Sequence, residues 1–398
     1  MQRLTKILLF LILILSLTLR VYQLDSHPPS ISWDEAAVGY NGWAIANFGK
    51  DEYGKSFPFY FRSFADDKHP VHVYFTALSI KLLGLSEFST RFPSSVFGVL
   101  NVLLIFFLAR IMFKSEFLGL IAAFFLAISP YNIHFSRFSH EANFASFFFM
   151  AGLILFYVSF KKTQKLLPLS ISSFAICFLT YHPSKVVVPM VIFVLITLYF
   201  NRIKTFIKNK KVVVSSSIVV IIFGLILISH PQLLGIARIN QTVQRGENKL
   251  FGRIKLILTQ YSWHFSPQYL FIQSDKNPRL SSQTGEFYKL DALFLILGVV
   301  YLLYKRSKES MILLSWALIA PLSSALVAEA PHAARASFMI GSWHIISALG
   351  LYFIVSLLSK PILKFILVAV TVVILALSLK NYLNHYFGEY SKRYAIEW

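Results

Sequence analysis

Long apolar runs alternate with short polar and basic segments along almost the whole chain. A helix needs roughly 20 mostly apolar residues to cross a bilayer, so the pattern predicts a polytopic, all-α membrane protein. About eleven spans are expected, at residues 5–22, 93–112, 116–134, 142–160, 166–181, 185–201, 212–229, 290–304, 311–328, 338–358 and 363–380.

A further apolar segment, residues 70–85, is shorter and contains His72 and Lys81. Whether this segment crosses the membrane determines on which side every later loop lies. Clusters of Lys and Arg lie two spans apart, and therefore on one side, at 161–165, 202–211, 305–308 and 360–364. Basic loops face the cytoplasm, and Arg3 and Lys6 belong to the same side only if 70–85 does not cross. We therefore predict an interfacial amphipathic helix there.

This topology predicts a cytoplasmic N-terminus and a multi-pass protein of the cell membrane. Residues 1–380 are expected to form one transmembrane domain, with a first external loop at 23–92 and a long external loop at 230–289. Residues 381–398 are expected to form a short external tail. None of the eleven histidines falls in a cytoplasmic loop. This asymmetry indicates an extracytoplasmic active site and disfavours a channel or a symmetric transporter.

Composition supports the membrane assignment: 56% of the residues are hydrophobic and only 14% are charged. The net charge of +20 does not indicate nucleic-acid binding, because Lys and Arg lie in loops between apolar runs. The single cysteine, Cys177, lies within an apolar run and cannot form an intrachain disulfide. No small-residue cleavage site follows the first apolar run, so it is expected to remain as a span.

Two adjacent carboxylates, Asp34 and Glu35, follow the first span. Acidic side chains at a membrane surface can abstract a proton from a hydroxyl or hold a metal. The ordinary alternative is a helix start, where acids in the first turn are stabilised by the helix dipole.

Other polar clusters occur at the expected external ends of spans. Asp66, Asp67, Lys68 and His69 form a run able to bind a metal or a phosphate, and Ser136–Glu141 combines a cation with an acid. Residues 329–335 place His332 three positions before Arg335, which is suitable for a lipid-linked phosphate. The ordinary alternative is a solvated loop for the first run and a helix cap for Ser136–Glu141. For residues 329–335 it is snorkelling of the long side chains to the membrane interface.

Together these motifs resemble a known enzyme group. They comprise one span followed by Trp33-Asp34-Glu35, then Lys68-His69-Pro70, Ser86–Pro93, Ser129-Pro130 and the Arg137–Glu141 stretch. The chain is similar over residues 1–190 to GT-C glycosyltransferases of the protein O-mannosyltransferase and aminoarabinose-transferase type, and more loosely to a prokaryotic branch beyond. Relatives often carry a further external domain, so the chain is expected to be a minimal or shortened member.

The resemblance implies a GT-C fold and transfer of a sugar from a polyprenyl-phosphate-sugar to a hydroxyl acceptor, usually with inversion. It implies that Asp34 is the base or acceptor-positioning residue, Glu35 its neighbour in the catalytic group, and Glu141 a second acid. For the donor phosphate the candidates are Lys68, Arg335, His332 and Arg137. Asp67 and His264 are candidates for a divalent metal; no other cofactor is implied.

Three other functions remain open from the residues. A transporter or flippase of lipid-linked sugars is expected to carry charged residues at mid-span, where no predicted span has a carboxylate. A ligase using a pyrophosphate-linked glycan would depend on Arg and His rather than on Asp34. A membrane scaffold would not need acids and bases gathered on one face.

Overall fold

The computed structural model describes residues 2–63, 67–161, 163–235, 250–327 and 329–398, and it is helical apart from two isolated β-bridges in the first loop. Seven helices are long and apolar enough to cross a membrane. They are α1 (Arg3–Val21), α4 (Glu87–Phe113), α7 (Ala142–Lys161), α9 (Ser184–Ile207), α10 (Lys210–Ser229), α16 (Met339–Leu357) and α17 (Pro361–Asn384). The chain is therefore a multi-pass membrane protein.

An eighth span arises if one bent pair counts as a crossing. α5 (Glu116–Ile128) and α6 (Pro130–Arg137) are bent by 55° at Ser129, within the single span expected at 116–134. Proline lacks an N–H and cannot continue the hydrogen-bond ladder, so Pro130 instead begins a new helix. The carbonyls of Leu126 and Ala127, released at the break, accept hydrogen bonds from the buried guanidinium of Arg20.

Three expected spans, 166–181, 290–304 and 311–328, form helices that are shorter than the others. α8 (Leu167–Phe178) has 12 residues and α13 (Lys289–Lys305) has 17. The third divides into α14 (Lys308–Ile319) and α15 (Leu322–Ala325) at Pro321. By length and composition, the described part of the chain therefore supports seven or eight spans rather than eleven.

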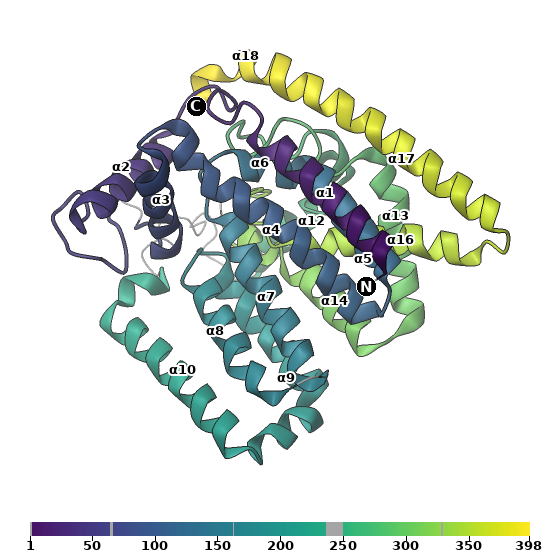
Figure 1. The fold of residues 1–398 in the computed structure, drawn as a ribbon, viewed down its shortest axis with the longest axis horizontal. Coiled ribbons are helices and arrows are strands. Elements are labelled where there is room, and N and C mark those ends of the chain that lie inside the picture. The colour runs from purple at the N-terminus through teal and green to yellow at the C-terminus, as the bar shows by residue number, and fades with distance from the viewer. Residues whose placement is uncertain (1, 64–66, 162, 236–249, 328) are drawn as a thin grey trace.

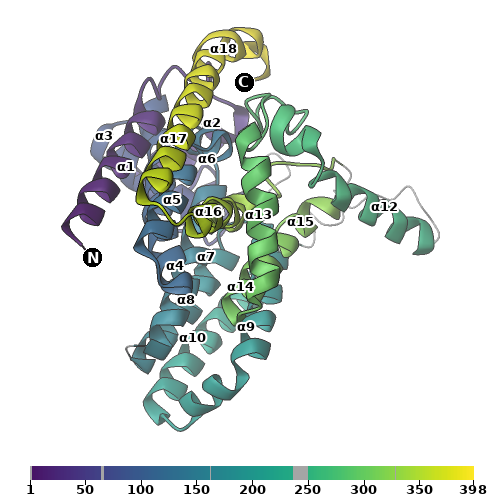
Figure 2. The same cartoon turned by 90° about the vertical axis from the view of Figure 1, so that its right-hand side faces the viewer.

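The first loop carries α2 (Trp33–Phe48) and α3 (Pro70–Leu83), which pack against each other. Gly42 permits this approach, because a Cβ there would lie 3.1 Å from Thr76 and 3.2 Å from the main chain of Ala77. The helix expected at 70–85 is confirmed, and at 14 residues it is about 21 Å long, shorter than the roughly 30 Å hydrocarbon core of a bilayer. In Figures 1 and 2, α2 and α3 lie at the end of the molecule opposite the α9–α10 turn.

The segment expected as a separate tail continues the last long helix. α17 passes through residue 380 without a break and is followed by a π-helical turn at His385–Tyr390 and α18 (Ser391–Arg393). Tyr386 and Tyr390 are fully buried, and the Tyr390 hydroxyl donates to the carbonyl of Pro278. The tail is thus packed against the rest of the protein (Figure 1). The other described helix of the long loop is α12 (Leu250–Trp263).

Of the three fully buried arginines Arg20, Arg91 and Arg137, the last two fix the segment that leaves α1. The terminal nitrogens of Arg137 donate to four main-chain carbonyls, those of Leu19, Tyr22, Gln23 and His27. Its guanidinium also lies over the ring of Phe387, 4.9 Å from the centroid. The sequence suggested Arg137 as a phosphate ligand. The structure instead places it inside the protein, where main-chain carbonyls satisfy its buried N–H donors.

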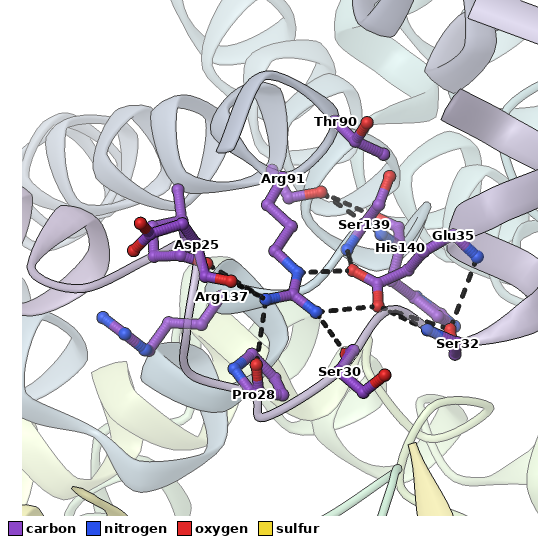
Figure 3. A network of polar contacts seen from close by, with 12 residues as sticks. Asp25, Pro28, Ser30, Ser32, Glu35, Thr90, Arg91, Arg137, Ser139 and His140 are labelled. Atoms are coloured by element: carbon purple, nitrogen blue, oxygen red, sulfur yellow. Dashed lines mark hydrogen bonds and ion pairs between the residues drawn. The ribbon is translucent and has the colours of Figure 1, made fainter. Parts of the chain in front are cut away.

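Arg91, on α4, forms the central polar contact of this end (Figure 3). Its Nε lies 2.9 Å from Oε1 of Glu35 and its Nη2 lies 3.2 Å from Oε2, so the pair is bidentate. Both side chains are completely buried. The remaining donors of Arg91 bind the carbonyls of Leu24, Asp25, Pro28 and Ser30, which form most of the connection between α1 and α2.

Both carboxylate oxygens of Glu35 also accept further hydrogen bonds. Its Oε1 accepts from the amide of Ser139 at 2.9 Å, and its Oε2 accepts from the amide of Ser32 at 3.1 Å. Ser32 and Glu35 form a capping box at the start of α2. One carboxylate therefore joins α2, α4 and the segment after α6.

We predict that Glu35→Gln lowers the free energy of unfolding by about 3–5 kcal/mol, because it leaves the Arg91 charge buried without its counter-charge. Thermal or denaturant unfolding of the detergent-solubilised protein measures this. Glu87→Gln, at an exposed acid in the first turn of α4, is the matched control and is expected to change little. Stability of Glu35→Gln equal to that of the control would contradict the role given to the pair.

Candidate active site

Asp34 lies at the second position of α2, beside Glu35 but facing a different environment. Its Oδ1 is 2.7 Å from Nζ of Lys68, and the Asp34 side chain is 51% exposed whereas that of Lys68 is 12% exposed. Lys68 is held by main-chain hydrogen bonds in both directions with Phe61, a buried residue of the same loop. The structure thus brings together two of the residues predicted from sequence, Asp34 and Lys68.

Glu141 lies in the segment that follows α6, near the same lysine. Its carboxylate is 4.0 Å from Nε2 of His140. Burial raises the pKa of Glu141, but the charges of His140, Lys68 and His72 act in the opposite direction and leave the pKa below its usual value. Burial also lowers the pKa of His140, so Lys68 is the positive charge that persists at neutral pH. Glu141 is therefore ionised at neutral pH.

His72, on α3, connects this group to the Glu35 network. Its Nε2 lies 2.7 Å from the hydroxyl of Ser139, whose amide donates to Glu35. Burial lowers the pKa of His72 to about 4, so the imidazole is neutral at pH 7. Figure 3 shows Ser139 and His140 lying beside Glu35 and Arg91.

A second lysine extends the basic side of the cluster. Nζ of Lys185, at the start of α9, lies 2.9 Å from Nε2 of His69 and 3.0 Å from Nδ1 of His182. Burial and the charge of Lys185 hold the pKa of His69 well below its usual value, so a neutral ring accepts from the ammonium. His182 and Lys185 were not among the site residues selected from the sequence. Their closeness in sequence to Pro183, which precedes α9, was the available signal.

His332 and Arg335 belong to a second group, around Asp275 and Glu329. Nδ1 of His332 lies 3.9 Å from Asp275, and Nη1 of Arg335 lies 3.6 Å from Glu329. Burial raises the pKa of Asp275 to about 6, although its Oδ2 accepts from the amide of Ala333 at 2.7 Å. Both candidate phosphate ligands are thus already in contact with carboxylates.

The segment that contains Asp275 also reaches α2. The guanidinium of Arg279 stacks over the ring of Trp33, 4.1 Å from its centroid, and Trp33 directly precedes Asp34. The carbonyl of Arg279 accepts a hydrogen bond from Nε2 of His134 on α6. The long loop therefore contacts the residue next to Asp34.

The residues suggested for a metal do not form a suitable site. Both ring nitrogens of His264 are engaged, Nδ1 with the carbonyl of Gln260 at 3.0 Å and Nε2 with the hydroxyl of Ser324 at 2.7 Å. Among the described residues, no group of three or more His, Cys, Asp or Glu side chains could hold a metal ion. Asp66 and positions 236–249 of the long loop lie outside the described residues. A metal held by Asp67 and His264 therefore has no part in the mechanism.

Comparison with known proteins gives a family match for part of the chain. Residues 67–228 match the family model described as dolichyl-phosphate-mannose-protein mannosyltransferase. This range contains Lys68, Glu141 and Lys185, and begins after Asp34. No curated protein sequence matches the chain.

Solved structures extend the likeness to most of the chain. The oligosaccharyltransferase of Archaeoglobus fulgidus in the apo form matches with a TM-score of 0.57 and 17% identity, over 88% of this chain and 50% of that one. Archaeal AglB from the same organism, in complex with an inhibitory peptide and a dolichol-phosphate, matches with a TM-score of 0.60 and 17% identity over 98% and 56%.

ArnT from Cupriavidus metallidurans bound to undecaprenyl phosphate matches with a TM-score of 0.54 and 14% identity, over 86% of this chain and 60% of that one. The chain spans between half and three fifths of the length of these three structures. Residues 67–228 are thus similar to the dolichyl-phosphate-mannose-protein mannosyltransferase family, and the chain has the GT-C-like fold of ArnT and of the archaeal oligosaccharyltransferase.

Proposed function

We propose that this protein is a membrane glycosyltransferase that moves a sugar from a polyprenyl-phosphate-sugar to a hydroxyl acceptor on the extracytoplasmic face. The observation that carries the proposal is the half-exposed carboxylate of Asp34, 2.7 Å from Lys68, at the N-terminus of α2. Structural relatives were solved with undecaprenyl phosphate and with a dolichol-phosphate, which supports a donor of this class.

The pair supplies the two charges that this reaction needs. As the acceptor oxygen bonds to the anomeric carbon, the bond from that carbon to the phosphate oxygen breaks and the polyprenyl phosphate leaves with the electron pair. Lys68 meets the charge that grows on the phosphate. Asp34 takes the hydroxyl proton. Attack on the face opposite the phosphate inverts the anomeric centre.

The other acids and cations have different roles in this proposal. Glu35 is a positioning residue, because its carboxylate is saturated by Arg91 and two amides. Glu141 is a second ionised acid near Lys68 that orients the donor sugar through its hydroxyls. Lys185, through its place in the same cluster, adds positive charge toward the phosphate. His332 and Arg335 remain donor-phosphate candidates only if they exchange their carboxylate partners for phosphate.

For the topology we propose eleven crossings, with the N-terminus in the cytoplasm and residues 1–398 forming one membrane domain that includes the packed tail. α8, α13 and the α14–α15 pair supply the three crossings beyond the seven long helices and the bent pair. All four basic turns then lie in the cytoplasm. Asp34, Lys68 and Glu141 lie on the opposite side.

We predict that Asp34→Asn lowers sugar transfer by about 10²–10⁴-fold, the usual contribution of a general base. Transfer is measured in membranes supplied with labelled undecaprenyl-phosphate sugars, including mannose. Asp25→Asn, which changes an exposed acid in the same external loop, is the control and should retain activity. Unchanged turnover by a stably folded Asp34→Asn protein would sink the catalytic assignment.

A ligase that uses a pyrophosphate-linked glycan is the second candidate, because the archaeal oligosaccharyltransferase shares the fold. The same assay therefore includes a polyprenyl-pyrophosphate-linked glycan. Transfer from the monophosphate donor alone is expected. Transfer from the pyrophosphate donor alone would replace our proposal with the ligase. Transbilayer movement of the donor without transfer would indicate a flippase.

The sidedness is tested by a reporter inserted at residue 114, between α4 and α5. We predict a cytoplasmic signal, since α3 does not cross in this topology. A signal from the external side would mean that α3 crosses the membrane. Lys68 and Glu141 would then lie on different sides. A reporter fused before α1, whose side does not depend on whether α3 crosses, serves as the cytoplasmic reference.

A further inference from the structure

An open groove of about 560 Å³ lies between α5, α16 and α17. None of Asp34, Lys68, Glu141 and Lys185 lies on these helices. α17 otherwise makes little contact with the protein, because only 11% of its most apolar stretch is buried. The groove is lined mainly by apolar and aromatic side chains, with a few polar groups: Phe117, Tyr352, Val355, Ser356, Lys364 and Phe365.

Lys364 gives the groove a charge that the protein does not neutralise. It lies in the first turns of α17 and is partly buried, and no acidic side chain pairs with it in the described part of the chain. An ammonium beside apolar walls at the edge of a membrane is costly unless it reaches water or an anion. Tyr352, which also lines the groove, has a hydroxyl that can donate to an anion.

We propose that this groove binds one anionic glycerophospholipid of the cytoplasmic leaflet, with its phosphate at Lys364 and an acyl chain along Phe117, Val355 and Phe365. The anionic headgroup of such a lipid matches the ammonium of Lys364, and its acyl chain matches the apolar walls of the groove. Lys360, in the preceding turn, lies on the side that the basic clusters assign to the cytoplasm. Anionic lipids are attracted to such juxtamembrane lysines, and basic pockets between helices bind their head groups.

Charge complementarity selects this occupant over two others. A neutral phospholipid would fill the apolar walls and leave Lys364 with a headgroup of no net charge. A second copy of the chain, packed through the apolar face of α17, would bury Lys364 further. The proposal is independent of the glycosyltransferase reaction, but its choice of the cytoplasmic leaflet rests on the membrane orientation proposed above.

The test measures lipid binding to the purified full-length protein in a non-ionic detergent. Native mass spectrometry counts bound lipids, and thermal unfolding reports stabilisation, with phosphatidylglycerol and phosphatidylcholine added separately. We expect one retained phosphatidylglycerol, and a rise in unfolding temperature that phosphatidylcholine does not give. Lys364→Ala should weaken phosphatidylglycerol binding about fivefold, the effect of one basic residue at a membrane surface.

Two further variants make the result specific. Lys380→Ala removes an exposed lysine near the other end of the same helix and should bind phosphatidylglycerol as the wild type does. Lys364→Arg keeps the charge and should retain binding. An unfolding temperature of Lys364→Ala equal to that of the wild type without added lipid shows that the variant folds.

Three results would overturn the proposal. Equal stabilisation by the two lipids would make the groove a general hydrophobic contact. Unchanged phosphatidylglycerol binding in Lys364→Ala would place the headgroup elsewhere. A dimer that persists in detergent and dissociates on Phe365→Glu would show that a second copy of the chain covers the groove.

Discussion

The buried ion pair between Arg91 and Glu35 is the interaction on which the arrangement of α2, α4 and the segment after α6 depends. Burying two charges is costly, and the pair is favourable only because each group is fully hydrogen-bonded. Here the carboxylate accepts from Arg91, Ser32 and Ser139, and the guanidinium also binds four main-chain carbonyls. The start of α2, the start of α4 and the segment after α6 are therefore held in one arrangement.

This arrangement explains how two adjacent acids have different roles. Glu35 faces inward and is fully buried, whereas Asp34, one residue earlier on the same helix, is half-exposed and pairs with Lys68. Because consecutive residues on a helix point about 100° apart, fixing Glu35 on Arg91 also fixes the direction of Asp34. The same pair positions the segment of Glu141 through the amide of Ser139. The Glu35–Arg91 ion pair thus aligns the Asp34–Lys68 pair, to which we assign the reaction.

The sequence predicts the membrane class and several elements well, for physical reasons. Apolar runs such as 142–160 must lie in lipid or in the core, and Pro70 and Gly84 bound the short α3. Hydropathy does not reveal where a helix bends inside an apolar run, so the break at Ser129 was not predicted. Hydropathy also predicts one continuous helix at 311–328, whereas Pro321 divides this segment into two helices.

Local sequence was less informative about charged side chains, since their role depends on what folds against them. Arg137 and Lys68 have the same formal charge, yet one satisfies four carbonyls inside the protein and the other pairs with Asp34. Lys185 joins His69 from 116 residues away, a contact that no local pattern predicts. The different roles expected for Asp34 and Glu35 came from the family resemblance, and the structure places the two carboxylates in different environments.

The most direct measurement of the central claim is the equilibrium binding of undecaprenyl phosphate to the purified protein, comparing Lys68→Gln with the wild type. Asp34→Asn and Lys81→Gln, an exposed lysine on α3, are the references. If Lys68 holds the donor phosphate while Asp34 handles the acceptor proton, Lys68→Gln should weaken binding by roughly tenfold or more, as expected for a charged hydrogen bond. Both references should bind as the wild type does. Wild-type affinity in a folded Lys68→Gln protein would contradict the account.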